Sequence, residues 1–147
     1  MNALPPPVFE QRVVCSVAAS IKFNVPANII LAVAEIENGR AGKSARNGNG
    51  TLDVGLMQFN TRYLATLAQF GIHATDVAAS NCYSFDLAAW RIAGHIDRDS
   101  GDIWTRAANY HSRTPVYNAI YRQKLVKAAA KWEVWLGERF QVKEVVR

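Results

Sequence analysis

The chain has 147 residues, of which 50% are hydrophobic and 20% are charged. This is enough apolar material for the core of one domain, and it excludes a disordered or fibrous chain. The longest apolar run, from Ile29 to Ala34, is far shorter than the roughly 20 residues that cross a bilayer, so we expect no membrane span. The net charge of +5 suits an anionic polymer. The basic residues are scattered and no known nucleic-acid recognition motif accompanies them, so we expect no nucleic-acid partner.

The predicted elements are almost all helices. Apolar residues at a spacing of four predict the first helix over residues 8–23. Pro26 fits the first turn of a second helix, which should end near Glu37 because Asn38-Gly39 favours a helix stop. Residues 40–54 are rich in Gly, Asn and Thr, and two consecutive Asn-Gly turn signals over 47–50 predict a short hairpin or an irregular lobe. Further helices are predicted from Asn60 or Thr61 to Gly71, over residues 84–98 and 103–110, and from Thr114-Pro115 past Trp135.

These elements form one domain without internal linkers or repeats. We expect it to cover residues 8–136, between a Pro-rich flexible start at 1–7 and a C-terminal tail at 137–147. The start has neither the basic region nor the apolar stretch of a signal peptide, so the chain is either cytosolic or a processed form of an exported protein. Cys15 and Cys82 fit one disulfide in an oxidising compartment or two unrelated buried thiols.

The second predicted helix carries two acids on different faces. At about 100° per residue, Glu35 and Glu37 point roughly 200° apart. Glu37 shares its side with Ile30 and other apolar residues, whereas Glu35 lines up with Asn28. Desolvation and the negative end of the helix dipole both favour the protonated carboxyl of Glu37, so its pKa should rise. Such a group can act as a general acid, although a solvated Glu at a frayed helix end fits the same pattern.

The sequence that follows Glu37 is a more specific indication of function than the helix face alone. Glu37-Asn38-Gly39 is followed by the Asn/Gly-rich loop and by the run Thr-Leu-Asp-Val-Gly-Leu-Met-Gln-Phe-Asn over residues 51–60. A cysteine near the start of the chain (Cys15), another in its middle (Cys82) and Tyr110 late in it accompany this run. This order of residues resembles the lysozyme-like lytic transglycosylase family. The small members attached to conjugation, pilus and secretion machines are the most similar. The resemblance covers residues 9–122 and implies a mainly α, lysozyme-like fold, with the acid helix and the loop on opposite walls of one cleft.

The resemblance implies roles for the matching residues. Glu37 falls on the catalytic acid/base, and Tyr110 falls on the tyrosine that closes the cleft near that Glu. It also implies that Cys15 and Cys82 are joined, and that the protein works in the periplasm. This chain departs from the family at two polar positions, with Asn38 in place of Ser and His111 in place of Asn. The residues expected to line the cleft and contact the glycan are Met57, Gln58, Asn60, Tyr110 and His111.

The expected reaction is cleavage of peptidoglycan between N-acetylmuramic acid and N-acetylglucosamine, with one acid/base and 1,6-anhydro products. It needs no cofactor and no metal, and His73, His95 and His111 show no metal-ligand spacing. Glycan strands and components of a secretion, conjugation or pilus machine are the expected partners of a monomeric protein.

Asp53 leaves the outcome of the reaction open. Animal c-type lysozymes have a second carboxylate in a similar run, and a lysozyme uses it when water is the acceptor. The first alternative is therefore a hydrolytic muramidase that uses Glu37 and Asp53. Asp53 could instead be a turn acid that binds backbone amides of the Asn-Gly loop. A glycan-binding scaffold of a secretion apparatus, with weak or no catalysis, is an alternative from a different class.

Overall fold

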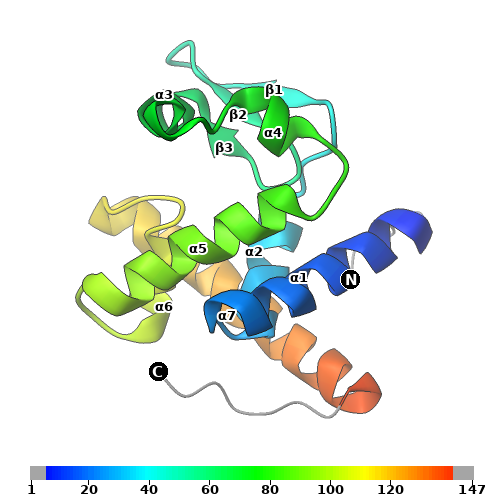
Figure 1. The fold of residues 1–147 in the computed structure, drawn as a ribbon. Helices are drawn as coiled ribbons and strands as arrows, with labels where there is room; N and C mark the ends of the chain where they lie inside the picture. The colour runs from blue at the N-terminus through cyan, green and yellow to red at the C-terminus, as the bar shows by residue number, and fades with distance from the viewer. Residues whose placement is uncertain (1–5, 141–147) are drawn as a thin grey trace.

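In the computed structural model, which describes residues 6–140, the chain forms two lobes connected by the loops of residues 38–43 and 79–82 (Figure 1). Five helices pack into a helical lobe, and three short strands with two small helices form the second lobe above it. The mainly α, lysozyme-like architecture is as predicted. The elements in chain order are α1 Pro6–Phe23, α2 Ala27–Glu37, β1 Ser44–Arg46, β2 Leu52–Val54, β3 Phe59–Asn60, α3 Thr61–Leu67, the 3-10 turn Ala68–Phe70, α4 Ala74–Ala78, α5 Tyr83–Arg98, α6 Ile103–Ala108 and α7 Pro115–Arg139.

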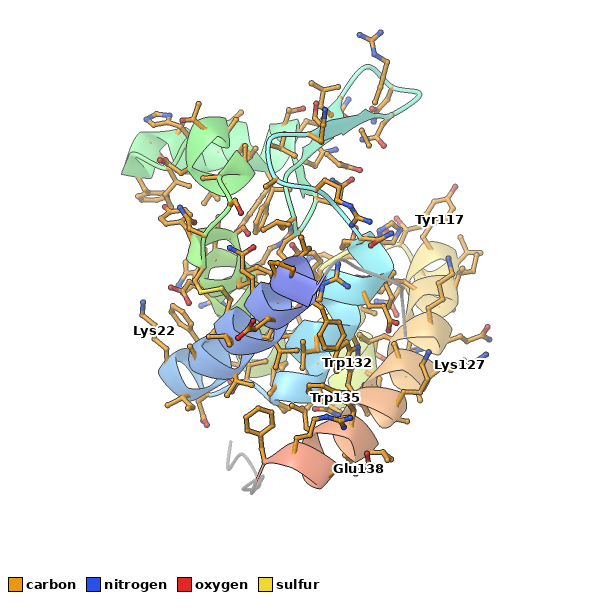
Figure 2. All side chains as sticks on the ribbon, turned by 90° about the vertical axis from the view of Figure 1, so that its right-hand side faces the viewer. Lys22, Tyr117, Lys127, Trp132, Trp135 and Glu138 are labelled. Carbon is orange, nitrogen blue, oxygen red and sulfur yellow. A yellow bond between two sulfur atoms is a disulfide. The ribbon has the colours of Figure 1, made fainter. Side chains whose placement is uncertain are left out.

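Helix α2 is the centre of the helical lobe. The six residues from Ile29 to Ala34 are all at most 1% exposed, because α1, α5 and α7 pack around the helix. The apolar run of the sequence is therefore a core helix, and no helix within residues 6–140 is long and apolar enough to cross a membrane. Trp132 of α7 completes this core and stacks on Phe9 of α1, beside Trp135 (Figure 2). A packed central helix gives the residue at its end a fixed position.

The second lobe contains the predicted hairpin and a third strand that was not predicted. β1 and β2 are antiparallel, with Ser44 opposite Val54, and the chain reverses between Asn47 and Thr51. β3 adds to the other edge of β2, so that Asp53 lies opposite Asn60. Asn60 then caps α3, since its side-chain oxygen accepts a hydrogen bond from the backbone N–H of Arg62 at 3.0 Å. One short sheet thereby positions both polar residues.

The observed elements differ from the predicted ones mainly at their ends. α1 begins at Pro6, and α7 continues to Arg139, which lies in the predicted tail. Residues 1–5 and 141–147, which make up most of the predicted start and tail, lie outside the described residues. α4 was not predicted: it is five residues long, and its first turn is held by Asp76, which accepts from the backbone N–H of His73 at 2.8 Å. A His at the N-cap gave no helix-start signal.

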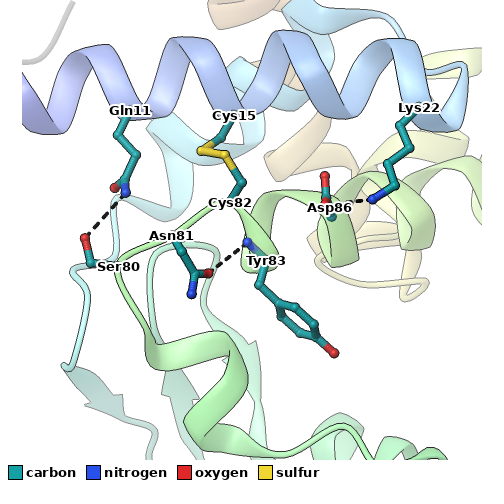
Figure 3. The surroundings of a disulfide bond; sticks show 8 residues. All are labelled: Gln11, Cys15, Lys22, Ser80, Asn81, Cys82, Tyr83 and Asp86. Atoms are coloured by element: carbon teal, nitrogen blue, oxygen red, sulfur yellow. Dashed lines mark hydrogen bonds and ion pairs between the residues drawn. A yellow bond between two sulfur atoms is a disulfide. The ribbon is translucent and has the colours of Figure 1, made fainter.

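The two cysteines are joined, which decides between the alternatives left open by the sequence. Cys15 of α1 and Cys82 at the start of α5 form a disulfide with a Cα–Cα distance of 5.0 Å (Figure 3). An ion pair between Lys22 and Asp86, at 3.2 Å, connects the same two helices further along. The bond fastens α1 to the start of α5, where the chain returns from the second lobe to the helical lobe. A disulfide also indicates an oxidising compartment.

Candidate functional site

Glu37 is the last residue of α2 and points its carboxyl into the cleft between the lobes. The helix stops there because Asn38 adopts the left-handed conformation, with φ at 48°, while its N–H still bonds to the carbonyl of Ala34 at 2.9 Å. A side chain at Gly39 would collide with the carbonyl oxygen of Gly55 and the side-chain amide of Gln58. The absence of a Cβ at Gly39 thus lets the turn of residues 55–58 pack against the end of the acid helix.

The carboxyl of Glu37 is prepared for proton transfer. Burial is the largest effect and raises its pKa from 4.5 to about 7. The Tyr121 hydroxyl opposes this by donating a hydrogen bond of 2.7 Å to the Glu37 Oε2 atom, while the negative charge of Asp53 adds to the rise. The positive charges of Arg91 and Lys124 favour the ionised form more weakly. Near neutral pH this group can therefore be either protonated or ionised.

Tyr121 is the residue of this site that the sequence analysis missed. It lies on α7, is 4% exposed, and its ring is covered by the parallel ring of His111 at a centroid distance of 4.8 Å. Its spacing from Asn118 and Leu125 matches the buried face of α7, so the pattern does not distinguish it from a core tyrosine. Nothing in the local sequence indicated that its hydroxyl reaches the end of α2.

Tyr110 lines the cleft, and its hydroxyl bonds to the backbone. The hydroxyl donates to the backbone carbonyl of Met57 at 2.7 Å, and burial raises the pKa of Tyr110 well above its usual value. The prediction for Met57 needs correction, because its side chain is fully buried and does not line the cleft. Gln58 does line it, with a left-handed backbone at φ 54° and a side-chain amide that donates to the Gly55 carbonyl at 2.9 Å.

Asp53 reaches the same cleft from β2. Its Oδ1 atom accepts a hydrogen bond of 3.0 Å from the side-chain amide of Asn60, which donates at the same distance to the Thr51 hydroxyl. Within residues 6–140 the amide at the end of the Asn-Gly loop, that of Thr51, bonds instead to the side chain of Asn49. Asp53 is thus held by a neighbouring strand and not by the loop, which does not support a turn-stabilising role.

The cleft joins these residues in one hollow of about 650 Å³. A second hollow of about 240 Å³ continues from it on the side of α7, and Glu37, His111 and Tyr117 line both. Arg91 of α5 also faces the cleft, with its guanidinium 4.1 Å from the ring centre of Tyr63 and 4.7 Å from that of Tyr110. Of the predicted site residues, those that line the first hollow are Glu37, Asp53, Gln58, Asn60, Tyr110 and His111.

The cleft offers carboxyl, amide and phenol groups for hydrogen bonding. The part of the chain that the structure describes contains no cluster of three His, Cys, Asp or Glu side chains able to hold a metal ion. The site can donate and accept a proton at Glu37, place a negative charge nearby at Asp53, and bind a polar polymer along its amides.

Comparison with known proteins connects this geometry to a family. The family described as "Transglycosylase SLT domain" matches residues 14–131, a stretch that contains every residue lining both hollows. The "Invasion protein IagB" of Salmonella typhimurium is 26% identical over 120 residues, which cover 81% of this chain and 73% of that protein, and the protein of the same name from Salmonella typhi matches equally. Such domains imply lytic transglycosylase activity on peptidoglycan, outside the cytoplasm. The chain belongs to the SLT-domain family of transglycosylases.

Proposed function

We propose that this protein cleaves the β-1,4 bond between N-acetylmuramic acid and N-acetylglucosamine in peptidoglycan and leaves 1,6-anhydro ends. The observation that carries the proposal is the partly buried carboxyl of Glu37, which lines the cleft and accepts a hydrogen bond from Tyr121, and its pKa of about 7 fits a group that serves first as acid and then as base.

The first step is proton donation by Glu37. The protonated carboxyl transfers its proton to the glycosidic oxygen, and the bond between that oxygen and C1 of the N-acetylmuramic acid breaks with its electron pair leaving on the oxygen. Positive charge then develops at C1, and Glu37 becomes a carboxylate. Tyr121 stabilises this carboxylate because its hydroxyl already donates to Oε2 at 2.7 Å.

In the second step the Glu37 carboxylate removes the proton from the C6 hydroxyl of the same sugar. The C6 oxygen attacks C1, a C–O bond forms, and Glu37 is protonated again for the next turnover. Because the C6 hydroxyl of the sugar is the nucleophile, the reaction consumes no water. Asp53 stabilises the positive charge at C1 electrostatically in both steps, and the hydrogen bond from Asn60 holds its carboxylate in place.

The remaining predicted residues bind the glycan. The side chains of Gln58, Asn60, Tyr110 and His111 line the hollow and contact the sugars. Met57 acts through its carbonyl, which fixes the hydroxyl of Tyr110, and not through its side chain.

The setting is proposed from the relatives and the disulfide. A relative named "Invasion protein" suggests that the activity opens the wall for a secretion, conjugation or pilus apparatus whose components bind this protein. The Cys15–Cys82 bond supports a periplasmic location, and the domain acts there as a monomer.

The products of digestion test the reaction. Purified sacculi digested with the protein should yield muropeptides whose ends weigh one water less than hydrolytic ends. Asp53 in the cleft favours hydrolytic muramidase action as the second candidate, and a majority of hydrated reducing ends would establish it. Binding to sacculi without any released product would instead establish the glycan-binding scaffold.

A further inference from the structure

One face of α7 continues the cleft outward from Glu37. At about 100° per residue, five exposed side chains of this helix fall within an arc of about 80°. We name this face the α7 ridge, and its members are Tyr117, Ile120, Lys124, Lys127 and Lys131. Tyr117 and Lys127 project from the outer side of α7 in Figure 2. The ridge is about 21 Å long at 1.5 Å per residue.

The ridge has two chemically different parts. Tyr117 and Ile120, which are 58% and 52% exposed, line the smaller hollow beside Glu37 together with Lys124. Side-chain amides line the larger hollow but not this smaller one. The smaller hollow therefore suits a ligand with apolar groups more than the polar edge of a sugar. Lys127 and Lys131 follow beyond the hollow, and the described part of the chain provides no ion pair for these two lysines or for Lys124. Arg122 points elsewhere, to the Thr105 hydroxyl at 2.6 Å.

We propose that the α7 ridge binds the peptide stem of the peptidoglycan strand that Glu37 cleaves. This rests on the proposed function, because the stem is attached to the N-acetylmuramic acid whose C1 bond breaks and must therefore leave the cleft beside Glu37. The stem begins with alanine and carries free carboxylates along its length. Tyr117 and Ile120 contact its methyl group, and the lysines pair with its carboxylates.

The dimensions agree with this occupant. An extended stem of about five residues reaches roughly 17 Å, which is close to the length of the ridge. The ridge also has an end: the next position on the same face is Trp135, which is half-buried against the rings of Phe9 and Trp132. The protein would then distinguish stem-bearing strands from bare glycan, since a stripped strand keeps only the lactyl carboxylate on the sugar and offers no carboxylate to the lysines further along the ridge.

The test compares two substrates and two variants. The substrates are glycan strands with intact stems and strands whose stems were removed by an amidase. The ridge variant is Lys124→Gln/Lys127→Gln/Lys131→Gln, and the matched control is Lys43→Gln/Arg46→Gln/Arg62→Gln, which removes the same charge from exposed positions on the other lobe. We expect the wild type and the control to cleave stem-bearing strands about 5- to 20-fold faster than bare strands at low salt, and the ridge variant to lose most of that preference.

A second measurement separates this proposal from the proposed function. Released stem peptides are titrated into the isotopically labelled protein, and the amide resonances of Tyr117, Ile120 and Lys124 should shift in the wild type and not in the ridge variant. Absence of cleavage on both substrates, with these shifts present, would refute the proposed function alone. Equal wild-type rates on both substrates, equal loss of both rates in the ridge and control variants, or no resonance shifts would refute the stem site.

Discussion

Replacing Glu37 by Gln should abolish wall lysis and at the same time stabilise the folded protein at neutral and alkaline pH. The carboxyl has a pKa of about 7 in the folded state against 4.5 as its ordinary value. Between these pH values the folded protein binds more protons than the unfolded chain, so the stability contributed by Glu37 falls as the pH rises through this window. The difference is about 3 kcal/mol once the pH exceeds 7. Gln has the same shape and no charge, and its amide oxygen still accepts the hydrogen bond from Tyr121.

The assay is urea unfolding of wild type and Glu37→Gln at pH 4.5, 6 and 8. The variant should match the wild type within experimental error at the lowest pH and gain about 3 kcal/mol at the highest, with a rate of sacculus lysis reduced by about 10²–10⁴-fold or more. Glu133→Gln on the exposed side of α7 is the control for the pH dependence. Glu35→Gln is the control for activity and should still lyse sacculi. A constant stability difference at all three pH values, or loss of lysis in Glu35→Gln, would refute the assignment of Glu37.

Three further changes test the surroundings of that carboxyl. Tyr121→Phe removes the donor that favours ionised Glu37, so the alkaline limb of the pH–activity profile should move to higher pH and the rate should fall; an unmoved limb would contradict the role of the hydroxyl. Asp53→Asn should lower the rate without raising the fraction of hydrated ends, measured by chromatography with mass detection. An unchanged rate with a lower melting temperature would show a structural role for Asp53. Cys15→Ser/Cys82→Ser should lower the free energy of unfolding by up to about 4 kcal/mol, and free thiols in exported wild-type protein would argue against the bond.

Most of the fold could be predicted because it depends on local signals. The boundary of α2 follows from Pro26 before it and Asn38-Gly39 after it, and the structure has the helix end at Glu37. The Asn-Gly pair at 47–50 likewise gave the hairpin of β1 and β2. β3 and α4 could not be predicted, because a two-residue strand and a five-residue helix are too short for a periodic pattern and are stabilised by their neighbours.

The sequence can point to a site residue whose own neighbours form a pattern, but it cannot show a contact between two residues that are far apart in the chain. The apolar face of α2 made Glu37 a candidate that the family resemblance then favoured, and burial is the largest cause of its raised pKa. The two tyrosines show the limit. Tyr110 was expected near Glu37 and lines the same cleft, with its hydroxyl bonded to the Met57 carbonyl, whereas the tyrosine that bonds to the acid is Tyr121, at 84 residues' separation. Only the packing of α7 along α2 brings that pair together, and no sequence window contains both.

The hydrogen bond between Tyr121 and Glu37 fits the use of one carboxyl in both steps of the proposed reaction. Burial alone would hold the carboxyl protonated, which suits the donor step but leaves a weakly populated base for the second. A hydrogen bond from Tyr121 to the ionised form offsets part of the burial effect, and the result is a pKa of about 7. An acid and a base of equal strength are available together only near that value. The ring of His111 lies parallel to that of Tyr121 at a centroid distance of 4.8 Å and lines both hollows beside Glu37, so a residue that differs from the family pattern packs directly on the tyrosine that bonds to the acid.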